Sequence, residues 1–109
     1  MPLISPSLLS ADFAHLAKDL DMINRSEADW LHLDVMDGAF VPNLSFGPSL
    51  LSAMKKQDAD TVYDVHLMLS DPSKYVEVFA NAGADIITIH QEAKRFESCL
   101  KKLRKLGVQ

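Results

Sequence analysis

The chain has 109 residues, which is enough for one domain or part of one. Hydrophobic residues make up 48% and charged residues 24%, as in an ordinary globular protein, and the formal net charge of −4 gives no basis for binding nucleic acid or an anionic membrane. The sequence shows no secretory signal, no apolar run near the roughly 20 residues that span a bilayer, and only one cysteine, Cys99. We therefore expect a cytoplasmic protein with no membrane or nucleic-acid partner and no internal disulfide.

The first half of the chain alternates between strand and helix patterns. Residues 3–9 are predicted to form a strand, which is irregular because a proline interrupts it. Apolar side chains at helical spacing follow over residues 13–23, and Asp12 is the predicted N-cap of that helix. Residues 29–35 are predicted to form a second strand, and Pro48 can begin a short helix.

The second half repeats this alternation. Its predicted elements are a strand over residues 61–68, a helix with Asp71 as its N-cap and Pro72 as its first residue that ends at Gly83, a strand over residues 85–90, a helix over residues 96–106, and the start of a further strand at Val108 and Gln109. Alternation of this kind indicates an α/β fold with a parallel sheet and helices packed against it. The sequence contains no linker, so we expect no domain boundary.

Polar side chains interrupt two neighbouring predicted strands. Residues two apart share a face of a strand, so His32 and Asp34 point the same way from one strand and His66 matches them from the next. Because parallel neighbours lie about 4.8 Å apart, the three groups can converge near the carboxyl ends of the strands, where α/β folds build their sites. Two imidazoles and a carboxylate suit a divalent metal such as zinc, manganese or iron. Spacing alone leaves open the alternative that they are ordinary hydrogen-bonded core residues.

Further candidates at the same ends of the predicted strands are Ser10, Met36, Met68, His90 and Glu92, and Asp64 lies two residues before His66 on the same face. Asp64 could orient a metal ligand or be an ordinary hydrogen-bonded core residue. The two methionines fill the core or cap the polar cluster. Ser10 is a turn residue or a donor to a ligand oxygen, and His90 and Glu92 are candidates of lower weight.

Five sequence blocks resemble the ribulose-phosphate 3-epimerase family. In order they are PSLLSAD from Pro6 to Asp12, LHLDVMDGAFVPN from Leu31 to Asn43, FGP from Phe46 to Pro48, DVHLM from Asp64 to Met68, and AGAD from Ala82 to Asp85. The resemblance implies a (β/α)₈ TIM barrel, of which residues 1–109 would be the N-terminal half with about the first four β/α units. It implies an isomerase of the pentose phosphate pathway that interconverts D-ribulose 5-phosphate and D-xylulose 5-phosphate. An allulose-6-phosphate 3-epimerase, or a non-catalytic metal-binding half barrel, stays open as an alternative.

The resemblance also implies residue roles. His32, Asp34 and His66 match three of the family's four ligands for one divalent ion, which is zinc in the first instance, with iron, manganese or cobalt as alternatives. Asp34 also matches one of its two acid–base aspartates. Matches to substrate-contacting positions are Ser10, Met36, His66 and Met68. Epimerisation needs a proton removed from one face of C3 and returned to the other, and the apolar loop of residues 38–46 could keep water from the intermediate.

Part of the family's site has no counterpart in these residues. In the family, the second catalytic aspartate and the phosphate site come from later strands, beyond the position of Gln109. We therefore expect residues 1–109 alone to be inactive. Open sheet edges invite pairing with another copy, so we also expect a homo-oligomer.

Overall fold

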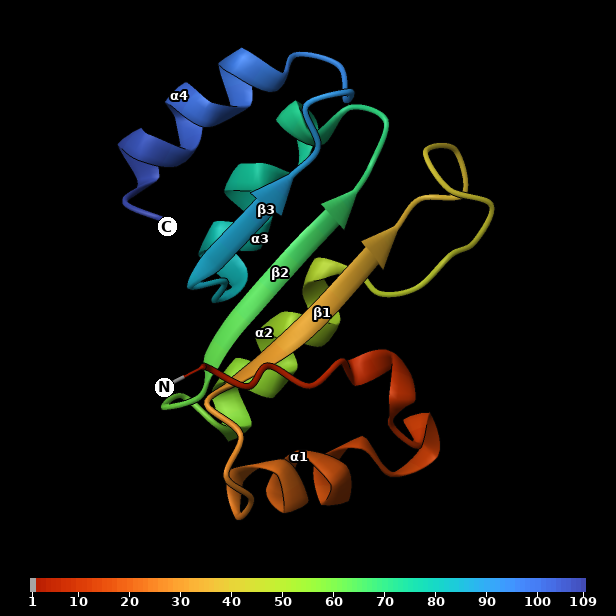
Figure 1. The fold of residues 1–109 in the computed structure, drawn as a ribbon, viewed down its shortest axis with the longest axis vertical. Helices are drawn as coiled ribbons and strands as arrows, with labels where there is room; N and C mark the ends of the chain where they lie inside the picture. The colour runs from red at the N-terminus through yellow and green to blue at the C-terminus, as the bar shows by residue number, and fades with distance from the viewer. Residues whose placement is uncertain (1) are drawn as a thin grey trace.

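The computed structural model describes residues 2–109. Three strands, β1 (Trp30–Met36), β2 (Val62–Met68) and β3 (Ile86–Ile89), form a parallel sheet in the order β1-β2-β3 (Figure 1). Each strand lies within one residue of its predicted bounds at either end. The predicted α/β class is confirmed, and the sheet is consistent with part of a barrel.

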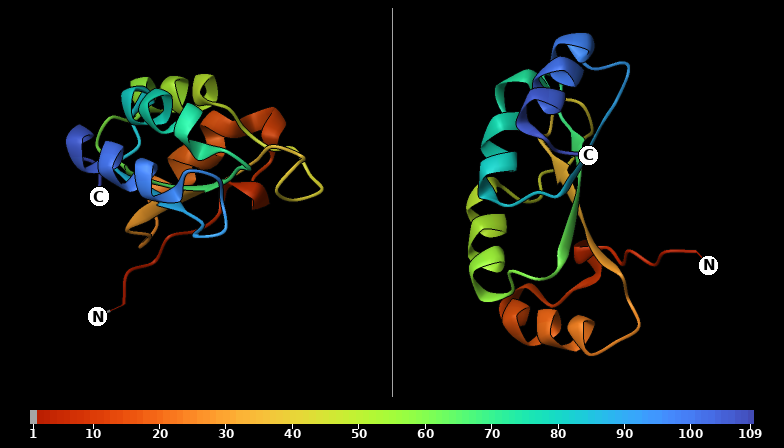
Figure 2. Two further views of the ribbon diagram at one scale, coloured as in Figure 1. Left: turned by 90° about the horizontal axis from the view of Figure 1, so that it is seen from above. Right: turned by 90° about the vertical axis from the view of Figure 1, so that its left-hand side faces the viewer.

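Four helices lie to one side of this sheet (Figure 2). They are α1 (Leu16–Asn24), α2 (Pro48–Gln57), α3 (Val76–Ala82) and α4 (Phe96–Leu106). Pro48 begins α2 as predicted, and the last two helices end at glycines with positive φ, a backbone conformation that L side chains rarely adopt. Within residues 2–109, none of these helices is both long and apolar enough to cross a membrane.

The core lies between the sheet and the helices. Alternate residues of β1 and β2 point into it and are fully buried, namely Leu31, Leu33, Tyr63, Val65 and Leu67. Leu51 of α2, Phe79 of α3 and Leu103 of α4 pack against the same cluster. Cys99, a free cysteine, is also buried there.

The predicted first strand, residues 3–9, is not a regular strand. In the described part of the chain it makes one bridge, between Ser7 and His32, and Pro6 O accepts a hydrogen bond from His32 N at 2.9 Å. The chain then turns into a 3-10 helix at Leu8–Ser10. Because the proline nitrogen cannot donate to a ladder, the segment follows β1 only as an irregular edge.

The last two residues extend the sheet on its other side. Ile87 N donates to Gln109 O at 2.9 Å, and Gln109 N donates to Asp85 O at 3.4 Å. This reciprocal pattern is that of a parallel pair, and it supports the predicted start of a further strand. Chain segments therefore lie side by side in sequence order from Ser7 to Gln109, as successive strands do in a parallel barrel.

Candidate metal centre

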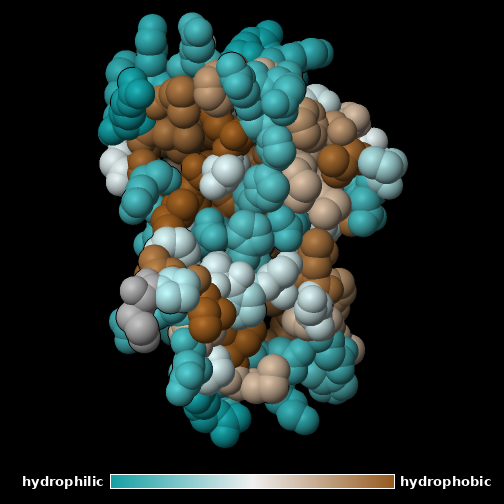
Figure 3. Space-filling model, viewed as in Figure 1, coloured by the Kyte–Doolittle hydropathy of each residue, from teal (hydrophilic) through white to brown (hydrophobic). Residues whose placement is uncertain are grey.

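Three polar side chains meet on the open face of the sheet. Asp34 Oδ1 lies 3.0 Å from His32 Nε2 and 3.1 Å from His66 Nδ1. One possible ligand atom from each residue lies within 4.8 Å of the others. Figure 3 shows this face, where polar side chains occupy the middle and hydrophobic side chains lie around them. The predicted convergence of the three groups is confirmed.

Strand alternation brings the cluster about. The residues between its members point toward the helices and are buried, so the cluster members must point to the opposite face. Register completes the arrangement, because Asp34 pairs with His66 across β1 and β2, and Met36 pairs with Met68 two residues further on. Both methionines are half-buried, next to the cluster in sequence.

Asp64 contacts Nδ1 of His32, the ring nitrogen that does not face Asp34. His32 Nδ1 lies 2.8 Å from Asp64 Oδ2, and Ser5 Oγ donates to the same oxygen at 3.1 Å. Partial burial lowers the pKa of His32, but the hydrogen bond to Asp64 and the charges of Asp64 and Asp34 outweigh burial, so the pKa is raised overall. This contact agrees with both interpretations of Asp64, as a residue that orients a metal ligand and as an ordinary hydrogen-bonded residue.

Asp34 is held as a carboxylate. Partial burial raises its pKa, but hydrogen bonds from Ser7 and His66 and the nearby His32 outweigh burial and lower the pKa overall. Ser7 Oγ donates to Asp34 Oδ2 at 3.0 Å, and Ser45 Oγ donates to the backbone oxygen of Asp34 at 2.5 Å. Sequence reasoning missed both serines, since each lies in an irregular segment where serine is common.

Nε2 of His66, the ring nitrogen that does not face Asp34, also has a partner. His66 Nε2 lies 2.7 Å from His90 Nε2, and the two rings stack with centroids 4.8 Å apart. His90 Nδ1 lies 3.4 Å from Glu92 Oε2, and the ring of Phe40 lies 5.0 Å from the His90 ring. His90 and Glu92 were the site candidates of lower weight. His90 contacts His66 of the cluster directly, and Glu92 contacts His90.

These groups fit a divalent metal ion. Two ring nitrogens and a carboxylate oxygen converge, and each imidazole has its other nitrogen next to a further polar group. Histidine ligands of metals in proteins are held in this way. Nitrogen and carboxylate donors suit zinc and other first-row metals alike, so the donor set does not choose among them.

Asp37 joins the two loops that follow β1 and β2. Its Oδ1 accepts hydrogen bonds from the backbone nitrogens of Ala39 at 2.9 Å and Phe40 at 2.8 Å, and its Oδ2 accepts one from Ser70 at 2.9 Å. These backbone donors lower the pKa of the Asp37 carboxyl. Sequence reasoning did not single out Asp37, although an aspartate directly before a glycine is a common turn residue.

Ser10 lies in a 3-10 helix, and the apolar loop of residues 38–46 follows β1. Ser10 is exposed in its 3-10 helix, and its substrate role stays a prediction. The loop of residues 38–46 extends beyond the end of β1 (Figure 1). Phe40 reaches His90, whereas Phe46 packs against Phe13 with ring centroids 5.5 Å apart. Exclusion of water by this loop also stays a prediction.

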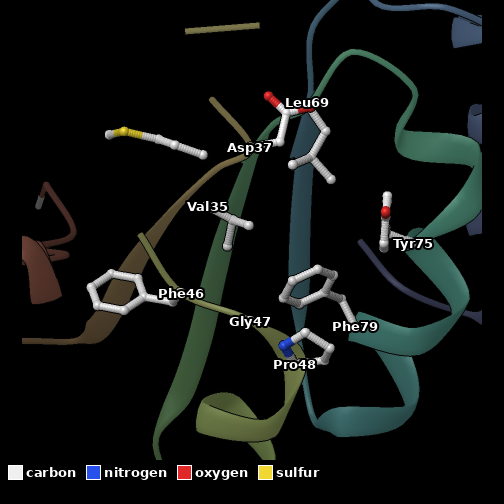
Figure 4. A pocket seen from close by; sticks show the side chains of 9 residues that line it. Val35, Asp37, Phe46, Gly47, Pro48, Leu69, Tyr75 and Phe79 are labelled. Atoms are coloured by element: carbon white, nitrogen blue, oxygen red, sulfur yellow. The ribbon is translucent and has the colours of Figure 1, made fainter. Parts of the chain in front are cut away.

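A cavity of about 190 Å³ lies on the helix side of the strand ends. Figure 4 shows it between the end of β1, the start of α2 and the helix α3. Val35, Leu69 and Phe79 give it a mainly apolar lining. It lies on the opposite face from His32, Asp34 and His66, so we do not assign it to the same site.

Fold and cluster together define an α/β protein with a possible metal site on the open face of a parallel sheet. The sequence profile described as the ribulose-phosphate 3 epimerase family matches residues 3–109, and the chain belongs to that family. The family fold is a TIM barrel, with which the parallel sheet agrees.

Individual curated relatives of this chain are named as ribulose-phosphate 3-epimerases. A ribulose-phosphate 3-epimerase of Synechocystis sp. is 46% identical over 95% of this chain and 46% of its own length. One of Rhodobacter capsulatus is 47% identical over 97% of this chain and 46% of its length. A ribulose-phosphate 3-epimerase of Oryza sativa, named as the cytoplasmic isoform, is 43% identical over 97% of this chain and 47% of its length. The chain spans about half the length of the curated relatives it matches.

Proposed function

We propose that this chain supplies the metal-binding part of a ribulose-phosphate 3-epimerase, which interconverts D-ribulose 5-phosphate and D-xylulose 5-phosphate. The observation that carries the proposal is the convergence of His32, Asp34 and His66 on one point of the open sheet face. The family match and the names of the relatives support the same reaction.

Each residue has a proposed role. His32 Nε2, Asp34 and His66 Nδ1 hold one divalent ion, with zinc as the first choice and iron, manganese or cobalt as alternatives. When bound, such an ion stabilises the negative charge that develops on the substrate oxygens. Asp34 is an ionised carboxylate at neutral pH, so it can take the C3 proton from one face of the substrate. Contacts to substrate are proposed for Ser10, Met36, His66 and Met68.

We also propose that residues 1–109 are the N-terminal half of a single (β/α)₈ domain. The sequence-ordered parallel sheet, with Ser7 on one side and Gln109 on the other, supports this arrangement. The proposed second acid–base aspartate and phosphate site lie beyond Gln109 in the family pattern. A polypeptide of these residues alone should therefore turn over ketose phosphate slowly or not at all. A cytoplasmic location is part of the proposal, and the name of the rice relative supports it.

The open face also favours self-association of a 109-residue polypeptide. Its polar cluster forms no dry core, and beside the cluster lie half-buried apolar residues such as Trp30 and Val62. A second copy could cover this face and pair with the sheet edges. Size-exclusion chromatography with light scattering should show a dimer or larger species. A well-folded monomer at all concentrations would contradict this part of the proposal.

A stereospecific assay tests the function. We expect a protein that carries this chain and the rest of the barrel to convert D-ribulose 5-phosphate into D-xylulose 5-phosphate and to exchange the C3 hydrogen with solvent deuterium. Chelation should abolish both, and an added divalent metal should restore them. D-allulose 6-phosphate, assayed in parallel, should be the poorer substrate by kcat/KM. Turnover that is unchanged by complete metal removal would overturn the proposed metal site.

A further inference from the structure

We propose that His90 is a positioning residue for His66, and this proposal rests on the metal site proposed above. When that site holds a cation, His90 Nε2 accepts the hydrogen of His66 Nε2. His66 is thereby fixed in the tautomer whose Nδ1 carries a lone pair, and that lone pair faces the point where Asp34 and His32 converge. His90 itself does not bind the metal.

The proposal begins with the short distance between two ring nitrogens. His66 Nε2 and His90 Nε2 lie 2.7 Å apart, which for two nitrogens requires that one of them carries the shared hydrogen. In a neutral imidazole one nitrogen is a donor and the other is an acceptor. Two arrangements are therefore possible, with the hydrogen on His66 or on His90.

Without a cation, the two nearby carboxylates favour opposite arrangements. Asp34 Oδ1, 3.1 Å from His66 Nδ1, can accept a hydrogen from that nitrogen, and Glu92 Oε2, 3.4 Å from His90 Nδ1, can accept one from His90. A cation held by His66 Nδ1 needs the lone pair of that nitrogen. The hydrogen of His66 is then on Nε2, His90 Nε2 accepts it, and His90 Nδ1 donates toward Glu92.

The second imidazole of the cluster has the same organisation. His32 Nδ1 lies 2.8 Å from Asp64 Oδ2, an acceptor, so with a cation on Nε2 the hydrogen of His32 is on Nδ1. In that state the lone pairs of His32 Nε2 and His66 Nδ1 both face the point next to Asp34 Oδ1, which lies 3.0 and 3.1 Å from the two nitrogens. His90 thus does for His66 what Asp64 does for His32.

Two aromatic contacts hold the His90 ring in place. It stacks on His66 at an interplanar angle of 24°, and the ring of Phe40 lies 5.0 Å away. Phe40 is itself fixed, because Asp37 accepts a hydrogen bond from its backbone nitrogen. His90 keeps 34% of its side chain exposed, so it could satisfy its nitrogens with water. The contact with His66 is therefore not forced on it by burial.

The tautomer of His90 is the direct test. Imidazole ¹⁵N spectra of the zinc-loaded 109-residue chain should show the hydrogen of His90 on Nδ1 and none on its Nε2. A spectrum of this sample with the His90 hydrogen on Nε2 would overturn the proposal, even if a variant fails to fold. Two variants serve the affinity measurements: His90→Leu removes the acceptor but keeps an apolar group under Phe40, and His90→Gln offers an amide oxygen in place of the ring nitrogen.

Metal affinity is the second readout. In zinc titrations of the same chain, His90→Leu should bind at least about 10-fold more weakly than the wild type, as expected when the orienting partner of a histidine ligand is lost. His90→Gln should recover most of that loss. Thr88→Val is the matched control, since Thr88 lies on the same face of β3 opposite His66 and should leave the affinity unchanged.

The outcomes separate this proposal from the function on which it rests. Equal zinc affinity in wild type, His90→Leu and His90→Gln, with all three folded by circular dichroism, would overturn the role of His90 and leave the metal site standing. A wild-type chain that binds no zinc would instead overturn the proposed metal site. A loss in both variants without recovery in His90→Gln would show that the ring is needed for packing and not as an acceptor, and it too would overturn the proposal.

Discussion

β1 and β2 present two faces with opposite properties. On the helix-covered face, Leu33, Val65 and Leu67 are fully buried, whereas His32, Asp34 and His66 on the open face stay partly exposed and contact one another. The two sets alternate along the same strands, so a shift of one residue in register would exchange them. Apolar burial on one face fixes the register, and the register places the polar groups on the other. Stability and chemistry are thus carried by different residues of the same strands.

Replacing a residue of the polar face should affect turnover far more than stability. In a protein with epimerase activity that carries this chain, we expect Asp34→Asn to lower kcat on the order of 10³-fold, because an amide cannot take up the C3 proton. Steady-state kinetics measure the loss, and the urea midpoint of the same variant should stay close to that of the wild type. A loss of only a few-fold would mean that Asp34 is structural and would remove the contrast between the faces.

Replacing a residue of the buried face should do the reverse. Leu67→Ala should lower the free energy of unfolding by about 2–5 kcal/mol, since it removes a fully buried side chain and leaves a cavity. Urea unfolding measures this change. Thr88→Ala on the open face is the matched control and should change stability by no more than about 0.5 kcal/mol. Similar losses for the two variants would contradict the difference between the two faces.

Replacing Asp37 tests whether the contacts between the loops after β1 and β2 contribute to stability. Asp37→Asn should cost about 1 kcal/mol of stability, since a neutral amide can replace only part of the three backbone contacts. The pKa of Asp37 is lowered in the folded state, so its contribution is present above the unfolded pKa of about 4 and is lost as the pH falls through the folded value. Urea midpoints should therefore differ between wild type and variant at pH 7 and converge below about pH 4. A difference that grows on acidification would contradict this role.

Glu92 should show the smallest effect. Its side chain is 72% exposed and lies 3.4 Å from His90, so solvent screens the contact. We expect Glu92→Gln to weaken zinc binding by less than about 3-fold, because the amide oxygen can still face the His90 hydrogen. Calorimetric zinc titrations should compare Glu92→Gln with Asp64→Ala. The second variant should lose more zinc affinity, since Asp64 is less exposed and only 2.8 Å from His32. An equal loss in the two variants would mean that exposure does not limit these contacts.

The regular parts of the fold could be predicted from the sequence because each carries a strong period. Three strands match their predicted bounds to within one residue, and the common face of His32, Asp34 and His66 follows from their spacing. The start of α2 at Pro48 could be predicted because proline favours the first position of a helix, a local preference that requires no contact from elsewhere in the chain.

The irregular parts could not be predicted, since their contacts are made by groups far apart in the sequence. Ser7 reaches Asp34 only because the edge segment follows β1, and nothing in a Pro-Ser-Leu stretch indicates that partner. Asp71 was predicted to cap a helix, but its side chain pairs instead with Ser73 and Arg95. His90 received low weight because its partner, His66, lies on a different strand.

The most direct test of the polar face is a crystal of the 109-residue chain grown with zinc and measured at the zinc absorption edge. An anomalous peak is expected between His32 Nε2, His66 Nδ1 and a carboxylate oxygen of Asp34, at about 2.0–2.2 Å from each. The same crystal of Asp34→Asn should show that peak weakened or absent. A wild-type map with no zinc at this point, or with the His32 and His66 rings on opposite faces of the sheet, would contradict the account.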